Sequence, residues 1–289
     1  MIFNGKLKEL FFKSSGLYQF AGAIFDKERR VTSRRRRYYV LRVAYLAILA
    51  LLILSVWTAG LAFSNAGGSS VYIASRMPEV GKGVIVSIAW TQFILLQFLA
   101  VVLLSSSISD EIYHRTLGVL MTTPISSFHI VTGKLLSRLL QLLLLLGISF
   151  PILAIVRVFG GVPWGYVVSS LLVTLTSAIF TGSVSQLFSI FYRRAHEVIL
   201  LTAFVCGILY AGPMIALEAY KYFYGPVHPG LSNTANHANP FFVMAVNTQE
   251  MFTAAGVTSI SLPLHLWIML AGIILWVGLS VIYVRRVGI

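Results

Sequence analysis

The chain has 289 residues, of which 57% are hydrophobic and only 11% are charged, and its mean hydropathy is +0.85. Soluble domains carry about 25% charged residues, so this composition excludes an ordinary soluble protein. Several runs of about 20 nearly uncharged residues are long enough to cross a bilayer as helices. They lack the alternating polarity of a transmembrane β-barrel. We therefore expect an all-α polytopic membrane protein.

The first 42 residues are basic and partly apolar, and they precede the first long apolar run. The run Arg34, Arg35, Arg36 and Arg37 is followed by two tyrosines, a pattern typical of anchoring at the lipid headgroups. Specific recognition of anionic lipids by these arginines is a sharper hypothesis. Upstream, "KLKELFFK" and "LYQFAGAIF" predict an amphipathic helix that lies in the membrane interface. We divide the chain into this interfacial segment, residues 1–42, and a membrane domain, residues 43–289.

Six apolar runs follow, and each is expected to be a membrane-spanning helix. The expected spans are Val43–Phe63, Val84–Ser106, Leu135–Phe159, Tyr166–Phe191, Val198–Tyr220 and Leu264–Val284. Of the 22 Lys and Arg residues, 18 fall on the side that holds both chain ends. Because cytoplasmic flanks are enriched in Lys and Arg, both termini are expected in the cytoplasm. This asymmetry also accounts for the net charge of +13 without nucleic-acid binding.

The connection between the second and third spans, residues 108–134, predicts a short cytoplasmic helix, a turn and a second helix. Asp110 and Glu111 are acidic residues of the kind favoured at a helix N-terminus. Pro124 disfavours helical geometry at the residue before it, and Ser126 can then cap a helix that continues into the third span. A half-apolar helix presented in this way fits a groove on a partner protein. An interfacial helix that touches only lipid is the alternative.

The fourth span carries hydroxyl residues at helical spacing on one face: Ser170, Thr174, Ser177, Thr181, Ser185 and Ser189. Small polar residues allow membrane helices to approach closely and to form hydrogen bonds across the contact. This row predicts either a helix-packing face or the polar lining of a transport path.

The connection between the fifth and sixth spans, residues 221–262, is a long outer loop, and long loops are commonly functional. Its stretch "NPFFVMAVNTQEMF" is expected to be a partly apolar helix against the membrane face. His228 and His237 lie in the same loop, but the sequence offers them no third metal ligand.

Motifs for catalysis are absent from the sequence. It contains no G-x-x-x-x-G-K-[ST] phosphate-binding loop and no H-E-x-x-H zinc motif. Ser149, Ser183 and Ser185 lie within spans, whereas none of the six histidines clearly does, and His265 is at the edge of the sixth span. No ionisable residue falls at a span centre, where a proton or sodium relay would need one. The sequence therefore argues against an intramembrane enzyme and an ion-coupled transporter.

The stretch from Glu111 to Lys134 resembles a motif of ABC-2-type permeases, roughly E-x-x-x-G/R-T-L-x-x-L-x-x-T-P-x-S-x-x-x-I-x-x-G-K. The matching residues are Glu111, Arg115, Thr116, Leu117, Leu120, Thr123, Pro124, Ser126, Ile130, Gly133 and Lys134. The basic entry "FDKERRVTSRRRRYYVLR" and the six expected spans are also similar to this family. The segment "EIYHRT" departs from the pattern because many members carry more charge there.

The resemblance implies a permease subunit that docks a separate ATP-binding-cassette ATPase and pairs with a second permease as a homo- or heterodimer. The implied docking residues are Asp110, Glu111, Arg115, Thr116, Leu117, Leu120, Thr123, Pro124, Ile125, Ser126, Gly133 and Lys134. ATP and Mg²⁺ would bind the partner ATPase, and this chain would bind no cofactor. The expected location is the plasma membrane, in bacteria the inner membrane, and the expected transport is export. A non-transporting scaffold that anchors an ATPase is the alternative.

Overall fold

The computed structural model describes residues 36–65, 70–113, 126–192, 194–252 and 261–287, and every regular element in these ranges is a helix. The expectation of an all-α membrane protein is confirmed. Within the described residues, six helices are long and apolar enough to cross a membrane. They are α3 (Arg36–Asn65), α4 (Ser70–Ser105), α7 (Ser127–Gly160), α8 (Trp164–Phe191), α9 (Ala195–Tyr224) and α12 (Leu262–Val287).

The expected interfacial helix lies outside the described residues, as do Arg34 and Arg35. Arg36 and Arg37 form the start of α3, but their side chains are also outside the description.

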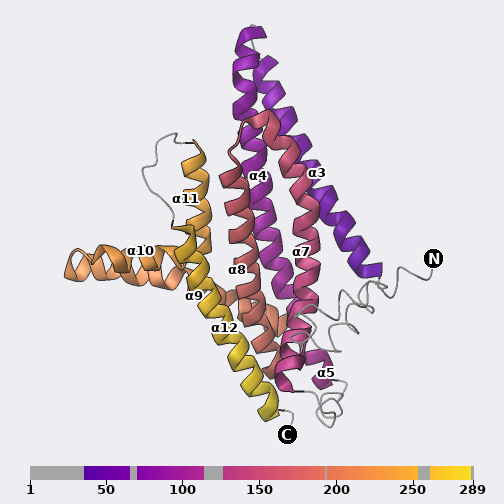
Figure 1. Ribbon diagram of the computed structural model, residues 1–289, viewed down its shortest axis with the longest axis vertical. Coiled ribbons are helices and arrows are strands. Elements are labelled where there is room, and N and C mark those ends of the chain that lie inside the picture. The colour runs from indigo at the N-terminus through magenta and orange to yellow at the C-terminus, as the bar shows by residue number, and fades with distance from the viewer. Residues whose placement is uncertain (1–35, 66–69, 114–125, 193, 253–260, 288–289) are drawn as a thin grey trace, which may run out of the picture.

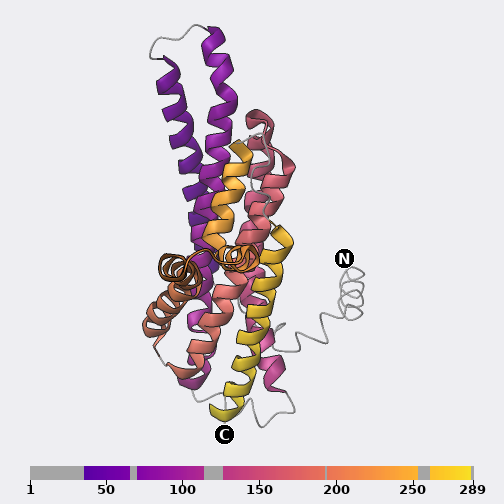
Figure 2. The same ribbon diagram turned by 90° about the vertical axis from the view of Figure 1, so that its left-hand side faces the viewer.

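Several helices extend well beyond the spans expected from hydropathy. Helix α4 has 36 residues and begins at Ser70, so much of the polar stretch expected as a connection is helical. At 1.5 Å per residue α4 is about 54 Å long, whereas a hydrocarbon core is about 30 Å thick. Figures 1 and 2 show the pair α3 and α4 projecting past the other helices at the end of the bundle opposite to α5.

Three shorter helices complete the described fold: α5 (Ser109–Tyr113), α10 (Pro229–His237) and α11 (Pro240–Phe252). Helix α5 follows α4 at the end of the bundle where α7 begins and α12 ends, while α10 lies across the direction of the long helices (Figure 1). Because α7 starts directly after Ser126 and the Ser126 side chain accepts a hydrogen bond from the His129 backbone N–H, the predicted cap is confirmed.

Helix α11 corrects the expected position of the "NPFFVMAVNTQEMF" segment. The segment is helical, as expected, but it packs against α8 instead of covering the membrane face. Val243 and Met244 are fully buried in the main core, and Figure 1 shows α11 running alongside α8. The apolar residues of this segment serve helix packing within the bundle.

The two outer-connection histidines belong to the helix α10 and not to an irregular loop. His228 is the N-cap residue of α10, and its ring Nδ1 accepts a hydrogen bond from the Gly230 backbone N–H at 3.2 Å. His237 ends α10 and is buried, with its Nδ1 2.7 Å from the Asn233 carbonyl oxygen and its Nε2 3.2 Å from Ser261 Oγ. His265 is fully buried within α12, and its Nδ1 donates to the His237 carbonyl oxygen at 2.8 Å. These contacts tie α10 to the start of α12. No group of three or more potential metal ligands occurs among the described residues.

Helix α8 is the centre of the bundle. In the apolar stretch of α8 that could span a membrane, 61% of the residues are buried inside the protein, whereas the corresponding share for α3 is 11%. Helices α4, α9, α11 and α12 all pack against α8. Glycines make two of these contacts close. A Cβ added at Gly182 would lie 3.1 Å from Leu104 of α4, and one added at Gly272 of α12 would lie 2.5 Å from the Phe180 ring. The absence of a side chain at Gly272 therefore sets the separation of α8 and α12.

The variant Gly272→Ala should weaken the α8–α12 contact, because its methyl group overlaps a ring that is itself buried in the bundle. Overpacking of this kind costs about 1–3 kcal/mol, so the Tm of the purified protein should fall by several degrees. Gly278→Ala on the same helix has nothing within 4 Å of the added Cβ and should leave the Tm unchanged or slightly higher, because Ala favours a helix over Gly. Equal Tm values for the two variants would contradict this packing.

Candidate functional site

Those predicted docking residues that the structure describes lie at the end of the bundle where α4 and α5 meet the first turns of α7. Of these residues the structure describes Glu111, Ser126, Gly133 and Lys134, together with the backbone of Asp110. The remaining ones lie outside the described residues: Arg115, Thr116, Leu117, Leu120, Thr123, Pro124 and Ile125. The described parts of the predicted docking segment are therefore its two helical flanks, α5 and the start of α7.

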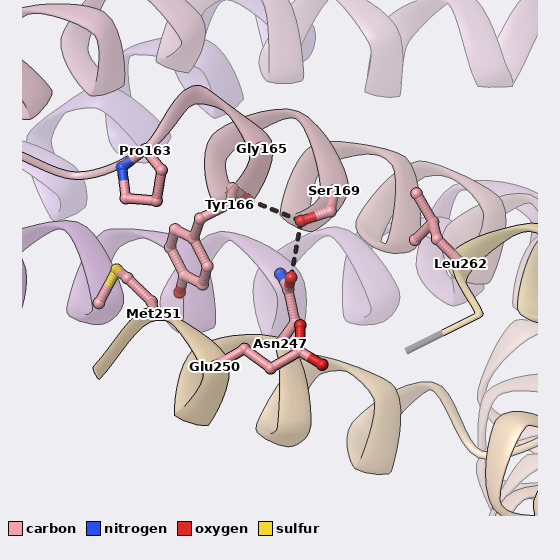
Figure 3. A pocket seen from close by; sticks show the side chains of 8 residues that line it. All are labelled: Pro163, Gly165, Tyr166, Ser169, Asn247, Glu250, Met251 and Leu262. Atoms are coloured by element: carbon pink, nitrogen blue, oxygen red, sulfur yellow. Dashed lines mark hydrogen bonds between the residues drawn. The ribbon is translucent and has the colours of Figure 1, made fainter. Parts of the chain in front are cut away.

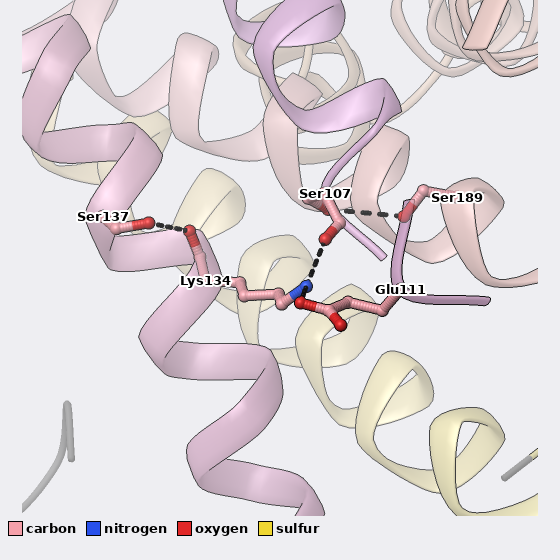
Figure 4. Close-up of polar contacts among 5 residues, drawn as sticks. All are labelled: Ser107, Glu111, Lys134, Ser137 and Ser189. Carbon is pink, nitrogen blue, oxygen red and sulfur yellow. Dashed lines mark hydrogen bonds and ion pairs between the residues drawn. The ribbon is translucent and has the colours of Figure 1, made fainter. Parts of the chain in front are cut away.

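A buried lysine joins these flanks. The Lys134 ammonium of α7 donates to the Ser107 carbonyl oxygen at 2.6 Å and to Glu111 Oε1 at 3.1 Å. Lys134 is 4% exposed, and the Glu111 side chain is 21% exposed. Figure 4 shows the lysine reaching from α7 to the residues that follow α4. Glu111 and Lys134 thus contact each other, although 23 residues separate them in the chain.

The chemistry of this link explains how a cation can be buried there. The Ser107 carbonyl lies just past the C-terminal end of α4, where unpaired carbonyl groups carry partial negative charge. Glu111 supplies a full negative charge on the other side of the ammonium. Removing one partner of a buried ion pair costs about 3–5 kcal/mol, because the other charge stays desolvated. The partial exposure of Glu111 places this link at the lower end of that range.

Two further hydrogen bonds extend the link to α8. Ser189 Oγ lies 3.4 Å from Ser107 Oγ (Figure 4), and Gln186 Nε2 donates to the Val131 carbonyl oxygen of α7 at 2.8 Å. The ends of α4, α5, α7 and α8 are therefore one hydrogen-bonded base, which we call the basal link: Ser107, Glu111, Lys134, Gln186 and Ser189. Sequence reasoning missed Ser107 and Gln186, although a glutamine within an apolar span is a signal that could have identified Gln186.

The hydroxyl row of α8 is buried along its whole length. All six residues, Ser170 through Ser189, are at most 4% exposed. Five of them donate to a carbonyl oxygen three or four residues earlier in α8, while Ser185 donates to the Val101 carbonyl oxygen of α4 at 3.0 Å. Thr181 also contacts Gln97 of α4 and the Tyr210 hydroxyl of α9. Within this chain the row faces neighbouring helices.

Ser149, Ser183 and Ser185, the serines that the sequence places within spans, also bond to carbonyl oxygens. Ser149 and Ser183 donate to carbonyl oxygens of their own helices, and Ser185 donates to α4. Within the described residues a serine hydroxyl contacts a histidine ring at Ser126–His129 and at Ser261–His237. Ser149, Ser183 and Ser185 have no such contact among the described residues, in line with the argument from the sequence against an intramembrane enzyme.

With this geometry established, comparison with known proteins identifies the family. The family model described as ABC-2 family transporter protein matches residues 22–286. The chain belongs to the ABC-2 family. It is therefore the multi-pass membrane component, or permease, of an ABC transporter, and such permeases are not themselves catalytic. A search of curated proteins found no match.

Membership of this family implies association with an ABC ATPase subunit. The match covers nearly the whole chain, including all nine described helices except the last residue of α12. Both the spans and the basal link of the permease therefore fall inside the family domain.

Lys134→Met should destabilise the permease by about 3 kcal/mol, because Glu111 and the end of α4 lose the cation that lies between them. The Tm should fall, and hydrogen–deuterium exchange should rise in α5 and in the first turns of α7. Lys221→Met is the matched control, since Lys221 and Glu218 form an exposed pair at 2.7 Å, and exposed pairs contribute less than about 1 kcal/mol.

The double variant Lys134→Met with Glu111→Gln tests the pairing itself. Because it removes both charges, its loss of stability should be smaller than the sum of the two single losses. Additive losses would show that the two side chains act independently.

Proposed function

We propose that the basal end of this permease faces the cytoplasm and docks an ABC ATPase, whose ATP hydrolysis drives export of a substrate. The observation that carries the proposal is the basal link, because it connects the predicted docking segment to three membrane helices through direct contacts. ATP and Mg²⁺ bind the ATPase subunit in this proposal, in agreement with the lack of a phosphate-binding loop in the sequence.

The basal link provides a path for force. A displacement of the docking segment acts on Glu111, which lies in α5, one short turn after α4, and is held by Lys134 of α7. Ser107 and Gln186 pass the same displacement to α8. Since α8 contacts α4, α7, α9, α11 and α12, movement of its end shifts the whole bundle as packed helices. ATPase opening and closing is thereby converted into a change of permease conformation.

Charge supports the cytoplasmic placement of this end. Arg285 and Arg286 lie in the last turn of α12, and the end of α12 lies beside α5 at the base in Figure 1. The basic start of α3, Arg36 and Arg37, lies toward the same half of the molecule. Lys and Arg gather on the cytoplasmic side of membrane proteins. We place the permease in the plasma membrane, in bacteria the inner membrane, with both termini inside.

A second permease subunit is the other proposed partner. Helix α9 exposes a stripe of apolar residues on one face, Leu200, Phe204, Ile208 and Ile215, each more than half exposed. Such a face is covered by lipid or by another permease. Because the α8 hydroxyl row is buried within one chain, we propose that the transport path forms between two permease copies. The active assembly then has two permeases and two ATPases.

Fusion of a fluorescent protein to the C-terminus tests the orientation. Green fluorescent protein fluoresces when it folds in the bacterial cytoplasm but not after export through the Sec pathway, whereas alkaline phosphatase is active only outside. We expect a fluorescent fusion at the C-terminus and an inactive phosphatase fusion there. Active phosphatase at the C-terminus would place the basal end outside and exclude docking of a cytoplasmic ATPase.

Docking and coupling are separated by two variants of the permease. Leu117→Asp introduces a charge into the predicted apolar docking face and should abolish co-purification with the ATPase encoded beside the permease. Lys134→Met should retain the ATPase but lower permease-stimulated hydrolysis and flux in liposomes at least tenfold, because the basal link is broken. Lys221→Met should behave as wild type.

The outcome of reconstitution also distinguishes the scaffold alternative. Docking and ATP hydrolysis without flux of any candidate substrate would favour a membrane anchor for an ATPase. Retention of the ATPase by Leu117→Asp together with full coupling in Lys134→Met would contradict the proposed docking end.

A further inference from the structure

A second site lies at the end of the bundle opposite to the basal link. A cavity of about 300 Å³ opens between the start of α8 and the helix α11 (Figure 3). Its polar lining residues are Tyr166 and Ser169 of α8 and Asn247 and Glu250 of α11. None of its lining residues belongs to the basal link or to the α8 hydroxyl row. The volume lies at the lower end of the range of ligand pockets.

Asn247 provides the observation that points to a ligand. The residue is 8% exposed, and its Oδ1 accepts a hydrogen bond from Ser169 Oγ at 2.7 Å. Its Nδ2 is buried and has no hydrogen-bond partner within the described part of the chain. Buried polar groups in proteins are ordinarily paired. Because Asn247 lines the cavity, a ligand bound there could supply the hydrogen-bond partner that its Nδ2 lacks.

The conclusion does not depend on which way the amide is turned. The single hydroxyl proton of Ser169 lies within reach of both Asn247 Oδ1 and the Tyr166 carbonyl oxygen, the latter at 3.1 Å. If the amide is rotated by 180°, Nδ2 donates to Ser169 Oγ, and the serine proton goes to Tyr166. Asn247 Oδ1 is then the atom without a partner. Either orientation leaves one buried polar atom of Asn247 without a partner among the described residues.

Glu250 limits the chemistry of that ligand. It lies three residues after Asn247, so both side chains extend from the same face of α11, as Figure 3 shows. The lining contains this one carboxylate and no basic residue, which disfavours an anionic ligand. A hydroxyl-rich ligand can contact both residues. One hydroxyl donates its proton to the Glu250 carboxylate and accepts from Asn247 Nδ2, or, if the amide is turned, a second hydroxyl donates to Asn247 Oδ1.

The remaining walls are apolar. Pro163, Met251 and Leu262 line the cavity together with the ring of Tyr166, whose own hydroxyl is 3.3 Å from Thr248 Oγ1. Apolar walls pack against the C–H faces of a saturated ring, and the Asn–Glu pair addresses hydroxyl groups at its edge. We propose that this cavity binds a neutral, hydroxyl-rich ring of the size of one sugar unit through Asn247 and Glu250.

Such a ring reaches the cavity from one of two sources. It is either a free sugar or the headgroup of a glycolipid in the leaflet at this end of the permease. Both present the same hydroxyl chemistry, so both are probes of the same site. The site does not rest on ATPase docking, since the cavity lies at the first turns of α8 and the basal link at its last turns.

Binding is tested on the full permease in phosphatidylcholine nanodiscs, because detergents with sugar headgroups would compete. Methyl α-D-glucopyranoside is titrated as the free probe, and nanodiscs containing monoglucosyl diacylglycerol compete with it as the lipid probe. Butylamine and acetate serve as cationic and anionic probes of similar or smaller size. Saturation-transfer NMR measures each affinity.

We expect saturable binding of the glucoside, of the glycolipid or of both, and no comparable binding of butylamine or acetate. Asn247→Ala and Glu250→Ala should each weaken binding at least tenfold. Glu218→Ala is the matched control, because it removes an exposed carboxylate of α9 outside the cavity, and its binding should equal that of the wild type. Glu250, which is half-buried, provides the second variant should Asn247→Ala lower the Tm.

Three results would overturn the assignment: absence of saturable binding of both sugar probes, tighter binding of butylamine than of the glucoside, or unchanged sugar binding in both cavity variants. A preparation that binds no sugar but still stimulates its ATPase would refute this site alone. Loss of ATPase stimulation with intact sugar binding would refute only the docking proposal.

Discussion

The bundle depends on burying a hydroxyl-rich helix at its centre. A backbone or side-chain polar group within a membrane needs a partner inside the protein, and the α8 hydroxyl groups find theirs mostly in carbonyl oxygens of the preceding turn. The side chains are thus small and internally satisfied, so neighbouring helices approach closely, as at Gly182 and Leu104. Helices α4, α9, α11 and α12 can surround α8 because most of its hydroxyl groups are already paired within α8. The neighbouring helices therefore need mainly to fit its surface and to supply few hydrogen-bond partners.

The polar groups at the two ends of α8 are paired in different ways. At the basal end, α8 is joined to α4 and α7 by hydrogen bonds around the buried Lys134. At the other end it packs against α11, where Ser169 bonds to Asn247 and the Asn247 Nδ2 stays unpaired in the described structure. A charged link resists separation of the helices that it joins, whereas an incompletely paired contact leaves room for a ligand. This asymmetry is in keeping with the proposal that an ATPase docks at the basal end.

The burial of the hydroxyl row bears on where a substrate would pass. In this conformation the row faces α4 and α9 inside one chain, so it does not line an open passage within the monomer. The outward faces of α3 and α9 are apolar and uncovered. A path between two copies, or one created when the helices around α8 separate, reconciles a tightly packed monomer with a transport family.

Hydropathy along the chain was sufficient to determine an all-α protein with six spans. Pro124 and Ser126 located the helix start, and the motif between Glu111 and Lys134 carried the resemblance to the family to which the chain belongs. These features are local, since transfer of a segment into lipid depends on its own composition. Tertiary structure alone decided that α11 enters the bundle, that Lys134 meets Glu111, and that the hydroxyl row faces other helices. Lipid and a helix interior are equally apolar, so hydropathy cannot distinguish a residue that faces lipid from one that faces a helix. A pairing across 23 residues exists only once α4 and α7 lie side by side.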